Sequence, residues 1–128
     1  MAIFPEGTTT SGDRLLKFHT SLFEPAVINA ATVSPAAIRY FTATGEPSDA
    51  PIFIGETTFG ESLSAIIASP RLIADITFAP AVAAQGATRR DVAVASENAI
   101  AAILNVPKPQ AHQRFHENAT PLALEISA

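Results

Sequence analysis

Near its N-terminus the chain reads Ile3-Phe4-Pro5-Glu6-Gly7-Thr8-Thr9-Thr10-Ser11-Gly12-Asp13. We expect the first three of these residues to form the end of a strand, because proline cannot donate to a sheet ladder. The residues that follow favour turns and caps, and they predict a loop. Pro5 fixes one backbone angle and Gly7 permits a sharp turn, so the carboxylate of Glu6 is expected at a strand end, where sites of α/β proteins usually lie. The loop hydroxyls and N–H groups could bind a polar head group; the plainer interpretation is a turn with a solvated Glu6.

Outward from this loop, periodicity and capping residues predict three helices and two strands. The helices are expected from Ser21 to about Ala31, over 59–68, and from a Thr88 cap to about Leu104; the strands are expected over 32–42 and 71–78. A short apolar run at 51–55 lies between them. Ser21 is the expected cap of the first helix, and Thr88 with Asp91 resembles a capping box. The expected buried stripe of the last helix is Val92, Ala95, Ala99, Ile100 and Ile103. Strands alternating with helices predict an α/β layered fold.

The composition excludes several classes of protein. The chain has 128 residues, of which 48% are hydrophobic and 16% charged, so it has enough apolar residues for one small folded domain. Its net charge of −4 does not favour nucleic-acid binding, which needs clustered basic residues. The absence of cysteine excludes disulfides, thiolate metal sites and a cysteine nucleophile. No apolar stretch reaches the roughly 18 residues needed to span a bilayer.

Two blocks of the sequence resemble the glycerophospholipid acyltransferases. The run from Ile3 to Phe18, followed by Ser21-Leu22-Phe23, is similar to the third signature block of that family, whose core is Phe-Pro-Glu-Gly-Thr. Val33-Ser34-Pro35-Ala36-Ala37-Ile38 is similar to the fourth block, at the right distance. Further on, Ile54-Gly55-Glu56, the helix around Leu63 and a strand over 73–82 follow the order of the family's C-terminal halves. The resemblance covers residues 3 to about 104.

The resemblance implies a fold and an activity. The expected fold class is α/β, a partial acyltransferase sheet with flanking helices whose N-terminal half is missing. Residues 1–105 would form the C-terminal part of an acyltransferase domain and 106–128 a disordered tail. The implied reaction transfers a fatty acyl group from acyl-CoA or acyl carrier protein to a lysolipid hydroxyl. The family's base is the His of a His-x-x-x-x-Asp motif upstream of the third block, and this chain lacks it, since His19-x-x-x-x-Glu24 has the spacing without the Asp. The chain alone is therefore expected to be inactive, and no catalytic residue is assigned.

The resemblance also implies an acceptor site at the loop. Glu6 would contact or orient the acceptor's hydroxyls, and Gly7 and Thr8 would shape the pocket. Thr9 stands where many members have an arginine that pairs with phosphate, and threonine cannot make a bidentate phosphate contact. This favours lysophospholipids with larger head groups, or ornithine lipids, over lysophosphatidate. Arg14 or Lys17 could supply charge instead, or could simply belong to a solvated face.

Cofactors and partners follow from the same resemblance. No cofactor and no metal are expected, because the acyl donor is a substrate and because His112 and His116, with Glu117, are the one weak metal pattern and fall in the expected tail. The expected partners are a lysolipid acceptor, an acyl donor and, through a full-length parent, a membrane surface; the expected location is cytoplasmic and peripheral to the membrane.

Two alternatives to an acyltransferase remain open. One is a complete, non-catalytic α/β module that binds a lipid head group or a partner chain. The other is a structural α/β domain that shares the loop by chance. The coding DNA upstream of Met1 would separate a truncated enzyme from such a module.

Overall fold

The structure is a computed structural model that describes residues 1–52 and 58–109. Its elements follow one another along the chain as a 3-10 helix η1 (Thr20–Phe23), α1 (Glu24–Ile28), β1 (Thr32–Val33), β2 (Ala36–Thr42), α2 (Phe59–Ala68), β3 (Leu72–Phe78), β4 (Val82–Ala83) and α3 (Arg89–Leu104). The expected mixture of helices and strands is present. The described strands form two small antiparallel sheets, β2 with β3 and β1 with β4.

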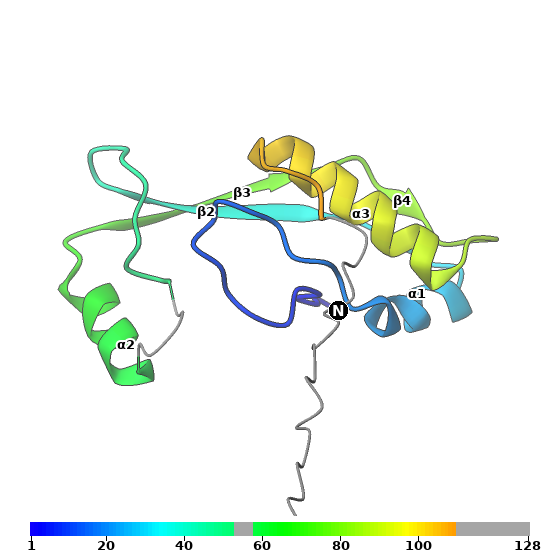
Figure 1. The fold of residues 1–128 in the computed structure, drawn as a ribbon, viewed down its shortest axis with the longest axis horizontal. Coiled ribbons are helices and arrows are strands. Elements are labelled where there is room, and N and C mark those ends of the chain that lie inside the picture. Colours follow the sequence, from blue (N-terminus) through cyan, green and yellow to red (C-terminus); the bar gives the residue numbers. More distant parts are fainter. Residues whose placement is uncertain (53–57, 110–128) are drawn as a thin grey trace, which may run out of the picture.

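A long two-stranded ribbon of β2 and β3 runs along the molecule (Figure 1). Its register pairs Ala36 with Phe78 at one end and Thr42 with Leu72 at the other. The strand predicted over 71–78 is confirmed within one residue. The strand predicted over 32–42 is interrupted after Val33, because Pro35 cannot donate to a ladder, and β2 begins immediately after this proline.

Both longer helices begin with a complete capping box. The hydroxyl of Thr88 accepts a hydrogen bond from the N–H of Asp91, while the Asp91 carboxylate accepts one from the N–H of Thr88, as predicted. Thr58 and Glu61 make the same pair of bonds at the start of α2. The prediction that Ser21 caps the first helix is wrong: α1 begins after Phe23 with no side-chain cap, since a 3-10 turn leads the chain directly into it.

The core lies at the α3 end of the molecule. It is formed by α3, the start of β2, η1, the N-terminal segment and the residue after β4, through Leu15, Phe18, Phe23, Ala37, Ala84, Val92, Ala93, Ile100 and Ala101. The rings of Phe18 and Phe23 stack with centroids 6.2 Å apart. The buried face of α3 consists of Val92, Ala93, Ser96, Glu97, Ile100 and Ala101. The predicted stripe was therefore rotated, because small and polar side chains at positions 93, 96 and 97 also face the core.

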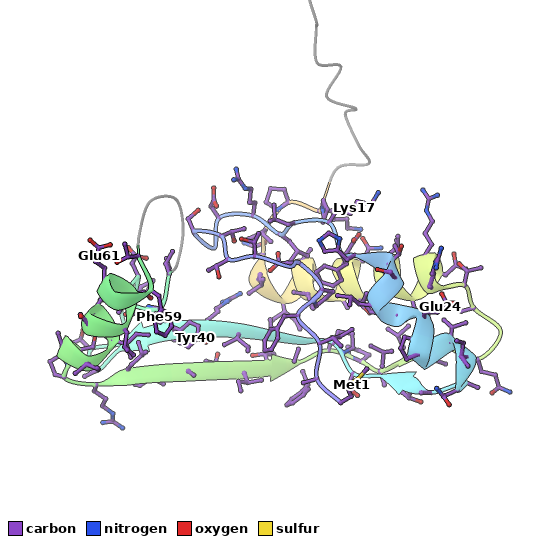
Figure 2. The ribbon with its side chains drawn as sticks, turned by 90° about the horizontal axis from the view of Figure 1, so that it is seen from below. Met1, Lys17, Glu24, Tyr40, Phe59 and Glu61 are labelled. Carbon is purple, nitrogen blue, oxygen red and sulfur yellow. The ribbon has the colours of Figure 1, made fainter. Side chains whose placement is uncertain are left out.

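The ribbon is covered on one side. Figure 2 shows the N-terminal loop, α2 and α3 on the same side of the ribbon, and among the described residues no helix lies on the opposite side. Ile38 and Ile76, which face each other across the ribbon, are 39% and 52% exposed, and Phe78 is 69% exposed. We call these three residues the open face. Helix α2 also exposes apolar side chains, Phe59, Leu63 and Ile67.

The expected strand at residues 3–5 is absent from the structure, where these residues lead into a turn. Residues 54–56 lie outside the described residues, as does the expected tail over 106–128 from residue 110 onward, which includes the histidines at 112 and 116 and the glutamate at 117. Within the described ranges, no helix is both long and apolar enough to cross a bilayer.

Candidate functional site

The Phe-Pro-Glu-Gly segment forms a tight turn. The carbonyl of Phe4 accepts a hydrogen bond from the N–H of Gly7 over 3.2 Å, and Pro5 occupies the second turn position, where its fixed angle is favoured. Gly7 has a φ of +70°, which side chains rarely adopt. A Cβ atom at Gly7 would also lie 2.9 Å from Nε2 of His19. Glycine is thus required here both by backbone angle and by space.

Glu6 closes the loop that follows this turn. Its Oε1 accepts a hydrogen bond from the N–H of Leu16 over 2.8 Å, ten positions further on. The carbonyl of Pro5 accepts a second bond from the N–H of His19, also over 2.8 Å. Glu6 is half-buried and not simply solvated. Since no strand reaches Pro5, the expectation that a strand end holds this carboxylate is wrong: the loop itself holds it.

The predicted binding residues Thr8 and Thr9 lie on the exposed outer part of the loop. Among the described residues, no hydrogen bond engages their hydroxyls, and the N–H groups of Thr8, Thr9 and Thr10 donate to no protein acceptor. Consecutive free N–H groups in a loop can bind an anionic or polar group. The loop therefore presents hydrogen-bond donors and hydroxyl oxygens to solvent.

Side chains within the loop shape its far end. The hydroxyl of Thr10 accepts from the N–H of Gly12 and donates to the carbonyl of Arg14, both over 3.3 Å. The hydroxyl of Ser11 donates to the carboxylate of Asp13. This hydrogen bond lowers the pKa of Asp13, with smaller help from its own backbone and from the charge of Arg14. Asp13 thus stays ionised, and exposed, at neutral pH.

The two basic candidates lie on the returning arm of the loop. Arg14 and Lys17 are exposed, and within the described ranges neither forms a salt bridge. Figure 2 shows Lys17 on the side of the loop away from the ribbon. Among the residues that the structure describes, neither cation forms a salt bridge with Glu6.

Sequence reasoning missed two residues at this loop. His19, which the sequence marked only by its spacing from Glu24, stands immediately before η1, and its ring lies against Gly7. Glu97 of α3 was not singled out, and its Oε1 accepts a hydrogen bond from the N–H of Phe18 over 2.7 Å. The sequence did contain a signal for Glu97. It is a charged residue among small residues of the last helix, and charged residues are rarely buried without a partner.

The loop is anchored by its returning arm. Leu15 and Phe18 are buried in the core, so the exposed segment between them and the turn is held at both ends. A shallow, mainly apolar pocket of about 210 Å³ lies elsewhere, between Thr42–Thr44 and Ser69–Arg71. It shares no residue with the loop. Together, the turn and the hydrogen bonds that close the loop leave the N–H groups of Thr8, Thr9 and Thr10 facing solvent.

Comparison with known proteins gives this surface a context. Over 100 residues, the chain is 32% identical to the lyso-ornithine lipid O-acyltransferase of Pseudomonas aeruginosa; the match covers 78% of this chain and 38% of that enzyme. Over 53 residues it is 38% identical to the 1-acyl-sn-glycerol-3-phosphate acyltransferases of Neisseria gonorrhoeae and Neisseria meningitidis, covering 41% of this chain and 21% of each relative. No family model matches the chain, and no solved structure matches it.

These relatives are all acyltransferases of lipid biosynthesis, the class that the Phe-Pro-Glu-Gly-Thr loop had indicated. The chain belongs to the lysophospholipid acyltransferase family. It spans about two fifths of the length of the Pseudomonas relative and about one fifth of each Neisseria relative.

Proposed function

We propose that the loop over residues 5–14 binds the acyl acceptor of a lysolipid acyltransferase, and that the parent reaction transfers a fatty acyl group from acyl-CoA or acyl carrier protein to the acceptor's hydroxyl. The observation that carries the proposal is the closed loop with free donors at Thr8, Thr9 and Thr10. A preformed loop binds at lower entropic cost than one that must be ordered by its ligand. Glu6 would then act mainly by holding the loop, since one of its oxygens already accepts from Leu16.

The acceptor that best fits the loop carries no bare phosphate. Thr9 cannot form the bidentate contact that an arginine would make to phosphate. The loop does offer the ionised carboxylate of Asp13 together with free N–H donors. A head group with both an amine and a carboxyl group, such as ornithine, matches this pair. The similarity to a lyso-ornithine lipid O-acyltransferase supports the same acceptor class.

The binding step can be tested with the 128-residue chain. Backbone amide NMR shifts would be followed while a short-chain lyso-ornithine lipid, and separately a short-chain lysophosphatidate, is added below its micelle concentration. We expect shifts at residues 6–14 and tighter binding of the lyso-ornithine lipid. Thr9→Arg should raise lysophosphatidate affinity about tenfold, and Asp13→Asn should weaken the lyso-ornithine lipid alone. Absence of loop shifts with both lipids, or tighter binding of lysophosphatidate by the unaltered chain, would contradict the proposal.

The chemical step requires a base that these residues do not supply. We infer that the chain alone does not transfer acyl groups, because its 128 residues contain no His-x-x-x-x-Asp motif and a positioned base contributes about 10²–10⁴-fold. The base would come from another part of a parent protein that works at the cytoplasmic membrane surface. An acyl-CoA assay checks the inference: turnover that His19→Ala abolishes would show that His19 is itself the base.

A further inference from the structure

Glu97 is a buried carboxylate with a single described partner. It lies on α3, the residue is 7% exposed, and its Oε1 accepts the hydrogen bond from the N–H of Phe18 across 79 positions of sequence. Burying a carboxylate costs free energy unless hydrogen bonds compensate for the lost water. The other buried members of this helix face are small or apolar apart from Ser96, so packing alone does not call for a glutamate at position 97.

The bond from Phe18 completes the closure of the loop. Leu16, Phe18 and His19 donate their N–H groups to Glu6, Glu97 and Pro5 respectively. The bonds to Glu6 and Pro5 join the returning arm to the turn of the same loop. Among the described residues, Glu97 is the one side chain from another element that hydrogen-bonds the segment over residues 5–19, so it ties the returning arm of the loop to α3.

The neighbouring buried serine behaves differently. Ser96 is 2% exposed, and its hydroxyl donates to the carbonyl of Val92 within α3 itself. It has the same helix and nearly the same depth as Glu97, but it makes no hydrogen bond to the loop. Ser96 is therefore a matched control for the effect of burying a polar side chain in this core.

We propose that Glu97 is a positioning residue of the acceptor site: its carboxylate fixes the amide of Phe18 and so sets where the free donors at Thr8, Thr9 and Thr10 are presented. This inference rests on the proposed function of the loop. Glu97 acts through Phe18 and does not touch the acceptor.

The test distinguishes the effect of the side-chain length at position 97 from the effect of its charge. Glu97→Gln keeps an acceptor oxygen at the same distance, so it should leave the Phe18 amide protected from hydrogen exchange and lower acceptor affinity no more than about threefold. Glu97→Asp keeps the charge but shortens the side chain, so it should lose that protection and weaken lyso-ornithine lipid binding about tenfold. Ser96→Ala should lower stability while leaving binding unchanged.

Several outcomes would overturn the assignment. Weak binding by Glu97→Gln with normal binding by Glu97→Asp would show that charge, and not position, is what matters. If Ser96→Ala loses as much stability and as much binding as the Glu97 variants, Glu97 has only a structural role. If the unaltered chain binds no lysolipid, the proposed function fails. The exchange rate of the Phe18 amide in the two Glu97 variants still tests whether Glu97 positions the loop.

Discussion

Phe23 and Phe78 show how differently the two parts of this small molecule are packed. Phe23 is 1% exposed and stacks on Phe18 beneath α3, whereas Phe78, at the end of β3, is 69% exposed. The loop, η1 and α3 share one core, while β3 and α2 expose apolar side chains that nothing in the described residues covers. The region around the candidate site therefore has its own buried core, whereas the open face carries exposed apolar side chains of the kind that usually fill a protein interior.

The largest expected effect comes from testing the two phenylalanines against each other. Phe23→Ala should lower the free energy of unfolding by about 3–5 kcal/mol, because it leaves a cavity in the core. Phe78→Ala removes the same atoms from a largely solvated position and should cost less than about 1 kcal/mol. Urea unfolding of both variants at low protein concentration measures the two values. Similar costs would mean that the open face is covered in solution.

The open face should make the isolated chain self-associate. Exposed apolar surface and unpaired strand edges promote association. We expect oligomers in size-exclusion chromatography with light scattering, and we expect Ile76→Ser with Phe78→Ser to weaken association by about 2–3 kcal/mol, the scale of burying such side chains. Thr9→Ala is the control, since it alters the loop and leaves this face intact. A monodisperse unaltered monomer with a sharp thermal transition would favour a self-sufficient module over a part of a larger domain.

Substitutions at two loop glycines distinguish the cost of backbone strain from the cost of contact with His19. Gly7 and Gly12 both have positive φ, +70° and +85°, so alanine at either should cost about 1–2 kcal/mol. A Cβ at Gly12 would meet no atom within 4 Å, whereas at Gly7 it would meet His19. Gly7→Ala should therefore be the more costly change in thermal unfolding. Adding His19→Ala to the Gly7→Ala chain should abolish this difference, and equal costs of the two glycine substitutions with His19 present would show that the imidazole moves aside freely.

The smallest expected effect is on how far the stability of the fold falls at acid pH. The hydroxyl and then the N–H of Thr88 lower the pKa of Asp91, and the N–H and then the hydroxyl of Thr58 lower the pKa of Glu61. A lowered carboxylate pKa gives stability that is fully present above the ordinary value, 3.8 for Asp91, and is lost as the pH falls through the lowered value.

Asp91→Asn should therefore flatten the fall in melting temperature between roughly pH 4 and pH 2. Glu61→Gln should change only the hydrogen exchange of α2, because that helix contributes little to the core. If Asp91→Asn leaves the fall in melting temperature at acid pH unchanged, other carboxylates cause most of that fall.

Local sequence signals predicted much of the secondary structure. Thr88 and Asp91, three positions apart, carry all the groups of a capping box, and the alternation of residues 71–78 predicts β3, because both patterns depend on neighbours in the chain. The Pro5–Gly7 turn could also be inferred, since proline and glycine restrict or release their own backbone angles. The family that the loop had suggested was confirmed by the relatives.

The sequence by itself thus determined the Pro5–Gly7 turn, the Thr88 cap, the positions of the longer elements and the family to which the chain belongs. The tertiary structure alone decided that Glu6 holds Leu16, that the ring of His19 lies against Gly7, and that Glu97 reaches Phe18 across 79 positions. It also decided that the alternating strand β3 has little burial on either face. The physical reason is the same in each case. Hydrogen bonds and burial between distant segments depend on how those segments pack in space, and local sequence propensities do not specify that packing.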